Sequence, residues 1–392
     1  MPNDIRGYFN RDLVLEYYPR GTTMIQPMGI WQIPNSKKHK TREIITEKQN
    51  DYFAEIKKDG NWYAVSVTTQ GVFLFARTIS KKTGLLVERG KNVPHIIESF
   101  KKMPAGTYIE GEIYYPNGNS DLVRTIMGCN ADKAVARQNG EDLKYNETVG
   151  NFNNEPRLVH YYIHNIIRYG LENLIEKTNL ERYNFLKEIY EKELKDNPYI
   201  ELADIIMPDE CNFFDKANEL IDKGEEGLVL KKINGLYYPD QKKAWETIKI
   251  KREDSIDAIC LGFEEPTKYY EGDCPESWQY WMNINDGSKV QGNYHNIPAY
   301  VPITKNYYYG WIGAITFGVY GEQGEIINLG SVSSGLTDDI RQEIKNNSNS
   351  FIMQPILLEC MEIYHGTSIR SPRFIKFRED INIQDCTINK LL

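Results

Sequence analysis

The first two-thirds of the chain contain short runs in which hydrophobic and polar residues alternate. Alternation with a period of two places the hydrophobic side chains on one face of a strand, so these runs predict half-buried β-strands. Gln70-Gly71 separates two of the runs, which predicts a β-hairpin with glycine in its turn. The predicted strands are Trp62–Val67, Val72–Ala76, Tyr108–Tyr115 and Gly227–Lys232.

Helical spacing of hydrophobic residues occurs in two further segments, Asn173–Leu194 and Phe213–Lys223. Strands and helices follow one another irregularly, without the regular alternation of a doubly wound parallel sheet. The pattern therefore predicts an α+β fold.

A second group of short strands begins after Arg252–Ser255, which we take as the domain boundary. Five or so strands and one helix, Thr337–Lys345, in about 140 residues predict a small β-barrel. The long, polar and aromatic-rich segment Glu264–Gly310 is interpreted as an insertion. We therefore predict two domains, residues 1–252 and 253–392. The strand candidates of the second domain are Asp257–Phe263, Trp311–Tyr320, Glu325–Leu329 and Pro355–Tyr364.

The composition is typical of a soluble globular enzyme, with 41% hydrophobic and 26% charged residues. The sequence contains no stretch of about 18 apolar residues, so we expect no membrane span. The N-terminus lacks the apolar segment of a secretory signal. The six cysteines lie far apart without a Cys-x-x-Cys pair, which indicates neither a disulfide framework nor a zinc site. We therefore expect a reducing, cytoplasmic setting.

The net charge of −8 argues mildly against a nucleic-acid partner, but the charge is unevenly distributed. Residues 253–392 contain 10 Lys and Arg against 19 Asp and Glu, whereas the preceding residues contain 37 against 36. The acidity therefore lies in the C-terminal third. A phosphate-binding groove in the first two-thirds remains compatible with the sequence, because local charges contact a phosphate backbone.

The segment Glu55-Ile56-Lys57-Lys58-Asp59-Gly60 contains the strongest candidate for covalent chemistry. A lysine attacks a phosphate only as the free amine, and removing its proton near pH 7.5 costs about 4 kcal/mol from an ordinary pKa of about 10.4. Burial and neighbouring cations lower that cost. Gly60 is expected to allow a tight turn beside a nucleotide. Taken alone, the hexapeptide somewhat favours a plain surface turn, because Asp-Gly is common in turns.

Carboxylates and lysines recur at the edges of other predicted strands. Glu110-Gly111-Glu112 places a carboxylate in an apolar strand, where it is suited to hold a divalent cation near phosphates. Glu225-Glu226-Gly227 begins another strand, which continues to Lys231. Lys249-Ile250-Lys251 directs two ammonium groups to one strand face, which favours a polyanionic ligand. Each segment alone is also compatible with a solvated strand face.

Taken in order, these segments form a series of four motifs. The series reads Glu-x-Lys-x-Asp-Gly, Glu-Gly-Glu, Glu-Gly-aliphatic-aliphatic-x-Lys and Lys-x-Lys, from about Met28 to Lys251. It resembles the motifs of the covalent nucleotidyltransferases, which include ATP- and NAD-dependent DNA ligases, RNA ligases and mRNA capping enzymes. The ordered series is far more specific than any single motif.

The resemblance implies roles in binding the nucleotide base and sugar. Lys57 is similar to the nucleophile that becomes lysyl-AMP, and Glu55 to the residue that reads the adenine edge. Arg77 is implied to contact the ribose or the substrate phosphate. The family's base-stacking element corresponds to Tyr162-Ile163-His164-Asn165-Ile166, with His164 or Tyr162 on adenine; an ordinary core strand is the alternative.

The resemblance also implies roles toward phosphates and metal. Glu112 is implied to bind ribose or metal, and Glu226 to lie near the catalytic Mg²⁺ or Mn²⁺. Lys231, Lys249 and Lys251 are implied to hold the phosphates of ATP, with the last two nearest the α-phosphate.

The C-terminal region indicates which branch of the superfamily applies. Gly330–Asp338 and Ser368–Asp380 resemble segments of the OB-fold domain of ATP-dependent DNA ligases. The second resembles the family's last motif, in which an arginine orients the leaving pyrophosphate; Arg378 is our first candidate and Arg373 the second. The resemblance thus implies a nucleotidyltransferase domain of antiparallel sheets flanked by helices, followed by an OB-fold barrel. Ser120–Gln138 also looks like phage-type ligases.

Two positions depart from the family pattern. Trp62 stands where the family usually has arginine, two residues after Asp-Gly, so we expect one substrate or nucleotide contact to differ. Ile381 stands where the last motif often ends in lysine, so pyrophosphate orientation is expected to depend more on the arginines.

The resemblance implies an ATP-dependent DNA ligase of minimal, phage or viral type that seals nicks through lysyl-AMP and AMP–DNA, acting in DNA repair, replication or recombination. We expect a cytoplasmic monomer whose C-terminal domain swings about Arg252–Ser255 and whose 264–310 insertion helps to grip the duplex. An insertion without a binding role is equally compatible with its composition. For the whole chain, an RNA ligase, a GTP-using capping enzyme and a nucleic-acid clamp without catalysis are the competing hypotheses.

Overall fold

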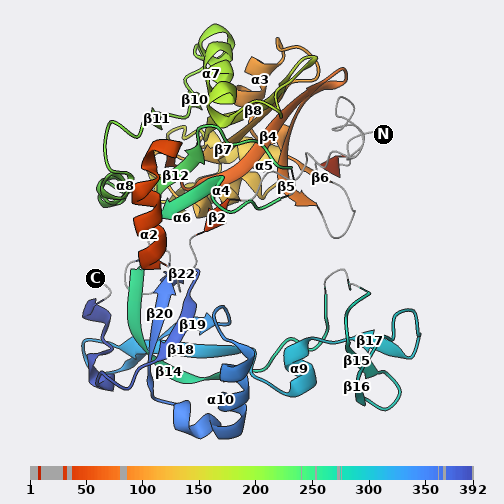
Figure 1. The fold of residues 1–392 in the computed structure, drawn as a ribbon, viewed down its shortest axis with the longest axis vertical. Helices are drawn as coiled ribbons and strands as arrows, with labels where there is room; N and C mark the ends of the chain where they lie inside the picture. Colours follow the sequence, from red (N-terminus) through yellow and green to blue (C-terminus); the bar gives the residue numbers. More distant parts are fainter. Residues whose placement is uncertain are drawn as a thin grey trace. The chain divides into compact units, whose positions relative to one another are not determined.

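The computed structural model describes residues 8–9, 30–32, 38–79, 86–239, 241–251, 254–271, 274, 276–360, 362–364 and 368–390. The chain forms two compact units, Met1–Lys251 and Arg252–Leu392, both drawn in Figure 1. Met28, at the start of the motif series, and Arg252, in the predicted boundary, lie outside the described residues.

The first unit contains a large sheet with the strand order β1-β6-β5-β4-β7-β8-β10, and β9 pairs with β8. Its ladders are antiparallel except for the one between β10 and β8. The predicted hairpin is present, because β4 and β5 pair from Thr68 and Gly71 onward. The strands are β1 (Tyr8–Phe9), β4 (Gly60–Thr68), β5 (Gly71–Ile79), β6 (Leu86–Glu88), β7 (Tyr108–Tyr114), β8 (His160–Tyr169), β9 (Glu172–Asn173) and β10 (Ile200–Leu202).

Helices cover one face of the large sheet and enclose its hydrophobic core. Alternate residues of β4 and β7, such as Val65, Ile109 and Ile113, point into this core and are fully buried. Polar residues define the helix starts: the side chains of Asn119, Asn130, Asp142 and Thr178 each accept a hydrogen bond from a backbone N–H of the first turn. The helices are α3 (Pro94–Phe100), α4 (Ser120–Met127), α5 (Ala131–Gln138), α6 (Leu143–Thr148) and α7 (Asn179–Ile189).

The first of the two predicted helices begins later than expected. Glu172–Asn173 forms β9, and α7 begins only after Thr178, which forms a capping box with Glu181. The helical periodicity starts earlier, but the cap decides where the backbone becomes helical. The predicted helix Phe213–Lys223 is confirmed as α8 (Phe213–Asp222).

A small sheet with the order β11-β3-β12-β13-β2 completes the first unit. Its inner strands pair antiparallel, and one face packs against α8 and α2 (Lys38–Glu47) through residues such as Ala54, Leu228 and Ile248. This face is hydrophobic because every second residue of each strand is apolar. The strands are β2 (Trp31–Gln32), β3 (Tyr52–Lys57), β11 (Ile205–Ile206), β12 (Gly227–Lys232) and β13 (Thr247–Lys251).

The second unit contains an antiparallel sheet with the order β19-β18-β14-β20-β23. The helical segment α10 (Asp338–Phe351) is kinked at Asn347, and its Arg341 donates to the carbonyls of Gly313 and Ser333 at 2.9 and 3.1 Å. Within the described residues no ladder joins β19 to β23, so the barrel predicted here is not closed by hydrogen bonds. The strands are β14 (Asp254–Glu264), β18 (Ala314–Tyr320), β19 (Ile326–Val332), β20 (Pro355–Cys360), β21 (Glu362–Tyr364), β22 (Ser368–Arg370) and β23 (Arg373–Phe377).

The predicted insertion is a folded subdomain. It forms a three-stranded antiparallel sheet and the short helix α9 (Lys305–Tyr309), joined through aromatic contacts such as Tyr280 with Tyr308. Aromatic side chains supply the packing that such a small sheet lacks. The strands are β15 (Tyr280–Asn283), β16 (Lys289–Gln291) and β17 (Tyr300–Pro302).

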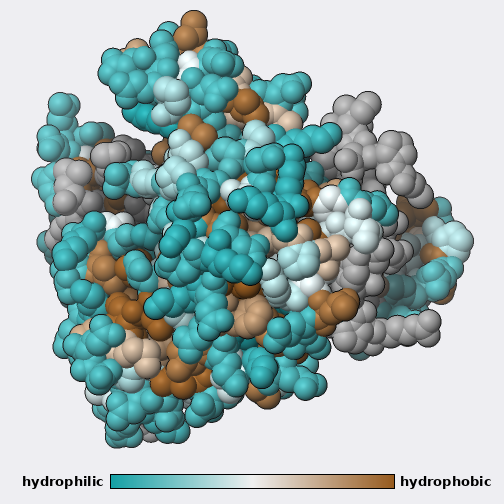
Figure 2. Space-filling view, turned by 90° about the horizontal axis from the view of Figure 1, so that it is seen from above, coloured by the Kyte–Doolittle hydropathy of each residue, from teal (hydrophilic) through white to brown (hydrophobic). Residues whose placement is uncertain are grey.

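One face of the protein is mostly polar. Figure 2 shows a mostly hydrophilic face on which hydrophobic residues form separate groups. Across the described ranges, no helix is both long and apolar enough to cross a membrane.

Candidate active site

Lys57 lies where the chain passes from one sheet to the other. It is the last residue of β3 in the small sheet, and Gly60 is the first residue of β4 in the large sheet. A Cβ atom at position 60 would lie 2.2 Å from the carbonyl oxygen of Ile113. Glycine is therefore required here by the close approach of β7, a reason that local sequence does not reveal.

Three neighbouring strands of the small sheet present charged side chains on their second face. Glu55 and Lys249 both pair with Val229, and Lys57 and Lys251 both pair with Gly227. Directly paired residues share a face, so the ladder register brings these charges together. With Lys231, the lysines at 57, 249 and 251 form what we call the lysine face.

Gly227 is required in the middle of the lysine face. Its φ of 133° lies in the region that favours glycine, and a Cβ atom there would lie 2.2 Å from the carbonyl oxygen of Ile250. A side chain at this position would also stand between Lys57 and Lys251.

The large sheet contributes a second row of side chains. Trp62, Glu112 and Tyr162 pair across β4, β7 and β8. The register shifts so that Glu110 pairs with Asn165 and Gly111 with Ile163, which leaves His164 as the extra residue of a β-bulge. Bulges redirect side chains, and His164 accordingly lines the same pocket as its neighbours Tyr162 and Asn165.

The two rows enclose a pocket of about 320 Å³, a volume suited to a nucleotide. Seven of the predicted residues line it, contributed by both sheets, and so does Tyr162, the alternative candidate for stacking on adenine. The seven are Glu55, Lys57, Arg77, Glu112, His164, Lys231 and Lys249.

Two ion pairs link β3 to the start of β12. The Nζ of Lys57 donates to Oε2 of Glu226 at 2.5 Å, and the Nζ of Lys58 donates to Oε1 of Glu225 at 2.7 Å. The side chains of Lys57 and Glu226 keep 19% and 12% of their surface exposed. The predicted nucleophile is therefore accessible and in contact with the predicted metal-site carboxylate.

Glu55 and Lys231 form a third, deeper ion pair. The Nζ of Lys231 lies 2.8 Å from both carboxylate oxygens of Glu55 and donates to the carbonyl of His164 at 2.8 Å. Burial raises the pKa of Glu55, and Lys231 opposes that rise. Lys231 is thus held beside Glu55, the residue predicted to read adenine. To contact a phosphate as predicted, Lys231 would have to share its ammonium group between Glu55 and the phosphate, or leave Glu55.

The electrostatics of the pocket favour a cation beside Glu112 and an anion beside Lys249. Burial raises the pKa of Glu112 to about 8, a net value to which the charge of Glu226 also contributes and which the charge of Lys57 lowers. Burial and the charge of Lys251 lower the pKa of Lys249. A divalent cation beside Glu112 would stabilise its charged form, and a phosphate group beside Lys249 would stabilise the charged form of that lysine.

His164 is better placed than Tyr162 to stack on a base. Tyr162 is 4% exposed, and its hydroxyl accepts a hydrogen bond from the backbone N–H of Asp204. His164 is half-buried, and burial lowers its pKa well below the ordinary value, so that the ring is neutral. A neutral, partly open ring is suited to stacking on adenine.

Comparison with known families decides the membership of the chain. A family model described as ATP dependent DNA ligase domain matches residues 34–251. The chain belongs to the ATP-dependent DNA ligase family. The match ends at the last residue of β13, so it includes the whole lysine face.

Individual relatives of this ligase-family chain are distant. DNA ligase 2 of Methanosarcina mazei is 24% identical over 231 residues, which cover 53% of this chain and 34% of that protein. The chain thus spans about a third of the length of this curated relative.

Two solved structures share the fold. Pmar-Lig_PreS3 aligns with a TM-score of 0.58 at 17% identity, over 90% of this chain and 68% of that one. A Lig E DNA ligase, described as binding DNA with a minimal scaffold, aligns with a TM-score of 0.53 at 13% identity, over 90% and 99% of the two chains. The likeness confirms the α+β nucleotidyltransferase and OB-fold class predicted for this ligase family member.

A buried network in the wall of the pocket is not marked as a unit by any sequence motif. Arg182, which is 1% exposed, donates from Nε to Asn165 at 3.0 Å, and Asn165 donates to Glu110 at 2.8 Å. Tyr237 donates to the other oxygen of Glu110 at 2.5 Å, and Arg182 also contacts Asn179. We call this set the arginine network. No motif marks Arg182, which is one of several charged residues in a predicted helix.

The arginines predicted to contact pyrophosphate lie in the second unit. Arg378 donates to both carboxylate oxygens of Asp380, at 2.6 and 2.8 Å, and to Asp257 at 3.0 Å. Arg373, on β23, is exposed. Their predicted contact with ATP stays a prediction, and Arg378 would have to exchange carboxylates for phosphate.

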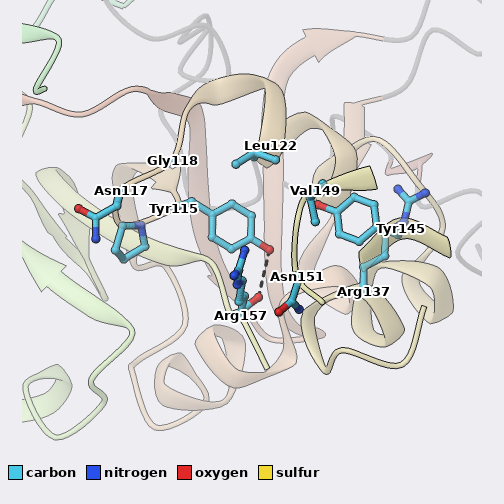
Figure 3. A pocket seen from close by; sticks show the side chains of 10 residues that line it. Tyr115, Asn117, Gly118, Leu122, Arg137, Tyr145, Val149, Asn151 and Arg157 are labelled. Carbon is cyan, nitrogen blue, oxygen red and sulfur yellow. Dashed lines mark hydrogen bonds between the residues drawn. The ribbon is translucent and has the colours of Figure 1, made fainter. Parts of the chain in front are cut away.

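A separate pocket of about 360 Å³ lies beside α4, α5 and α6 of this ligase-family chain (Figure 3). Tyr115 and Tyr145 extend along its wall, and the hydroxyl of Tyr115 donates to the carbonyl of Arg157 at 3.0 Å. None of the predicted site residues lines this pocket. We therefore assign the candidate active site to the pocket that contains Lys57.

Proposed function

We propose that this protein is an ATP-dependent DNA ligase that seals nicks with a 3′-hydroxyl and a 5′-phosphate. The observation that carries the proposal is the position of Lys57, which contacts Glu226 and faces the pocket from within the family's matched region. The whole activity is proposed for this chain from its site and its family membership.

In the first step, Nζ of Lys57 attacks the α-phosphorus of ATP. Glu226, the hydrogen-bond acceptor of Lys57, first takes a proton from the Nζ ammonium group, which frees the amine for attack. A phosphorus–nitrogen bond then forms as the bond to pyrophosphate breaks, and the second Nζ proton passes to water. Lys249 and Lys251 neutralise the phosphates from the same strand face. Such transfers depend mainly on positioning and charge neutralisation.

The second and third steps transfer and release AMP. An oxygen of the 5′-phosphate attacks the lysyl-AMP phosphorus, the phosphorus–nitrogen bond breaks, and AMP–DNA forms. The 3′-hydroxyl then attacks the adenylylated phosphate, and AMP leaves as the phosphodiester forms. We assign the ribose or this phosphate to Arg77, whose guanidinium carbon lies 5.6 Å from the ring centre of Trp62.

Glu112 and Glu226 are the residues proposed to hold Mg²⁺ or Mn²⁺. In the described part of the chain no group of three or more His, Cys, Asp and Glu side chains could hold a metal unaided. Mg²⁺ usually binds one or two carboxylates together with substrate phosphates, so this donor set fits the ion. When bound, the ion supplies charge neutralisation at the phosphates.

The remaining expectations concern the whole protein. We propose a monomer in the cytoplasm whose second unit carries Arg373 and Arg378 to ATP in one pose and covers nicked DNA in another. Small-angle scattering with ATP and with nicked DNA tests this cycle, and identical curves would contradict it.

The insertion is proposed to help grip the duplex. The Nζ of Lys289 lies 4.0 Å from the ring centre of Tyr307, and Lys268 also lies over this ring. Replacing both lysines with alanine should weaken binding of nicked DNA about threefold and reduce its salt dependence. Unchanged affinity would leave the insertion without a binding role.

The decisive test incubates the protein with α-³²P-labelled ATP and Mg²⁺ beside Lys57→Ala. Label should appear on the wild type alone and pass to nicked DNA. If no label appears even after pyrophosphate treatment removes any AMP already attached, the protein is no ligase and a non-catalytic clamp becomes the better hypothesis. Labelling by GTP instead of ATP would indicate a capping enzyme, and transfer to RNA alone an RNA ligase.

A further inference from the structure

A second hollow, of about 380 Å³, adjoins the nucleotide pocket and is lined in part by residues of β4, β5 and β6 of the large sheet. It shares Trp62 and Arg77 with that pocket, and it continues to Arg89, after β6, and to Arg124 on α4. We call it the arginine hollow. The shared residues make it a neighbour of the site where AMP would be attached to Lys57.

Among the described residues, the arginine hollow is lined by three guanidinium groups and by no acidic side chain. Two carboxylates lie near the hollow: that of Glu88 is hydrogen-bonded to the backbone, and that of Asp121 is exposed to solvent. Glu88 accepts hydrogen bonds from the backbone N–H groups of Gly90 and Leu74, at 2.5 and 3.3 Å. Asp121 lies 3.2 Å from Arg124, but these side chains are 53% and 71% exposed, so their ion pair is weak.

At position 62 this chain differs from the family pattern in the location of a positive charge. Where the family pattern has arginine, this chain has an indole, so the usual cation is missing from β4. Arg89 and Arg124, which the motif series does not include, line the same hollow from other elements. The positive charge absent at position 62 is thus supplied from α4 and from the residue that follows β6.

We propose that the arginine hollow binds phosphate groups of the DNA strand that carries the 5′-phosphate, with Arg89 and Arg124 as positioning residues. The proposal rests on the proposed function, because the 5′-phosphate must reach AMP on Lys57. Guanidinium groups bind phosphate oxygens through paired N–H donors, and an open hollow beside the nucleotide pocket admits a strand end.

The test uses Arg124→Ala and Arg124→Lys, with Lys133→Ala as the matched control. Lys133 is an exposed cation on the neighbouring helix α5 and does not line the hollow. Arg124→Ala should weaken binding of nicked DNA about tenfold and lower the salt slope by about 1. AMP transfer from preformed enzyme–AMP to the nick should slow more than self-adenylylation does, and lysine should restore only part of the loss.

Backbone substitution identifies the strand. Neutral methylphosphonates in the 5′-phosphate strand should weaken binding to the wild type and add little to the loss in Arg124→Ala. Unchanged affinity and salt slope in Arg124→Ala, or coupling only to the opposite strand, would overturn the proposal. The affinity measurement needs no adenylyl transfer, so it tests the hollow even if Lys57 takes up no AMP.

Discussion

The lysine face and the arginine network lie in the same unit, but their charged groups differ in exposure and in the number of hydrogen-bond partners. On the lysine face, Lys57 has one carboxylate partner and keeps 19% of its side-chain surface exposed. In the arginine network, Arg182 is 1% exposed and has several acceptors, while Glu110 accepts two hydrogen bonds. The first set can exchange partners with an incoming nucleotide, whereas the second cannot open without leaving a buried charge.

The difference separates chemistry from scaffold. A charge with one accessible partner is easily transferred to a phosphate, because water and ligand replace what is lost. A fully buried charge with complete hydrogen bonding holds its neighbours in one arrangement. The two regions meet in the pocket, because the residues of the arginine network line it together with Lys57, Lys231 and Lys249.

The largest effect should come from Lys57→Arg. Self-adenylylation should fall by at least about ten-thousandfold, because a guanidinium is not deprotonated and cannot attack phosphorus. The melting temperature should change little, because the new side chain keeps the charge opposite Glu226. Gel labelling with ATP and calorimetry provide the two readouts, and residual labelling would remove Lys57 from its role.

Arg182→Met, unlike Lys57→Arg, should lower the stability of the protein. The free energy of unfolding should fall by about 3–5 kcal/mol, because Glu110 and Asn165 lose their buried partner. Denaturant titration measures the loss. A fall below about 1 kcal/mol would show that the arginine network is not structural.

Glu226→Gln should lower self-adenylylation about a hundredfold, because the amide keeps the side-chain shape but takes no proton. Glu225→Gln is the matched control, since Glu225 pairs with the neighbouring Lys58 at 2.7 Å. Stability should stay similar in both variants. Equal losses of rate would mean that the charge near β12, rather than contact with Lys57, governs the step.

The smallest effect should come from His164. Its pKa is depressed from 6.5 by burial, so the unfolded state takes up the proton first as pH falls, and stability is lost below about pH 6.5. His164→Phe should reduce that acid loss of melting temperature while keeping KM for ATP within about threefold; His164→Ala should raise KM about tenfold. Equal KM values in the two variants would contradict stacking.

The sequence alone located several of the longer strands and the order of the motifs. Period-two alternation identified β4, β5, β7 and β12 to within about three residues at each end, because sheet faces demand it. Lys57, Glu226 and the pair Lys249 and Lys251 were recognisable from their order and spacing. Residues such as Lys57 and Lys251 come together because they lie on one polar face of strands that pair in register.

The remaining features depended on contacts between segments far apart in the chain. The bulge that turns His164 into the pocket arises from the pairing of β8 with β7, and the need for Gly60 arises from Ile113. Arg182 carries no motif, and only its burial beside Glu110 makes it important. The sequence by itself therefore determined the elements and the reactive residues, whereas the tertiary structure decided their partners and burial, because those depend on side chains that local sequence does not specify.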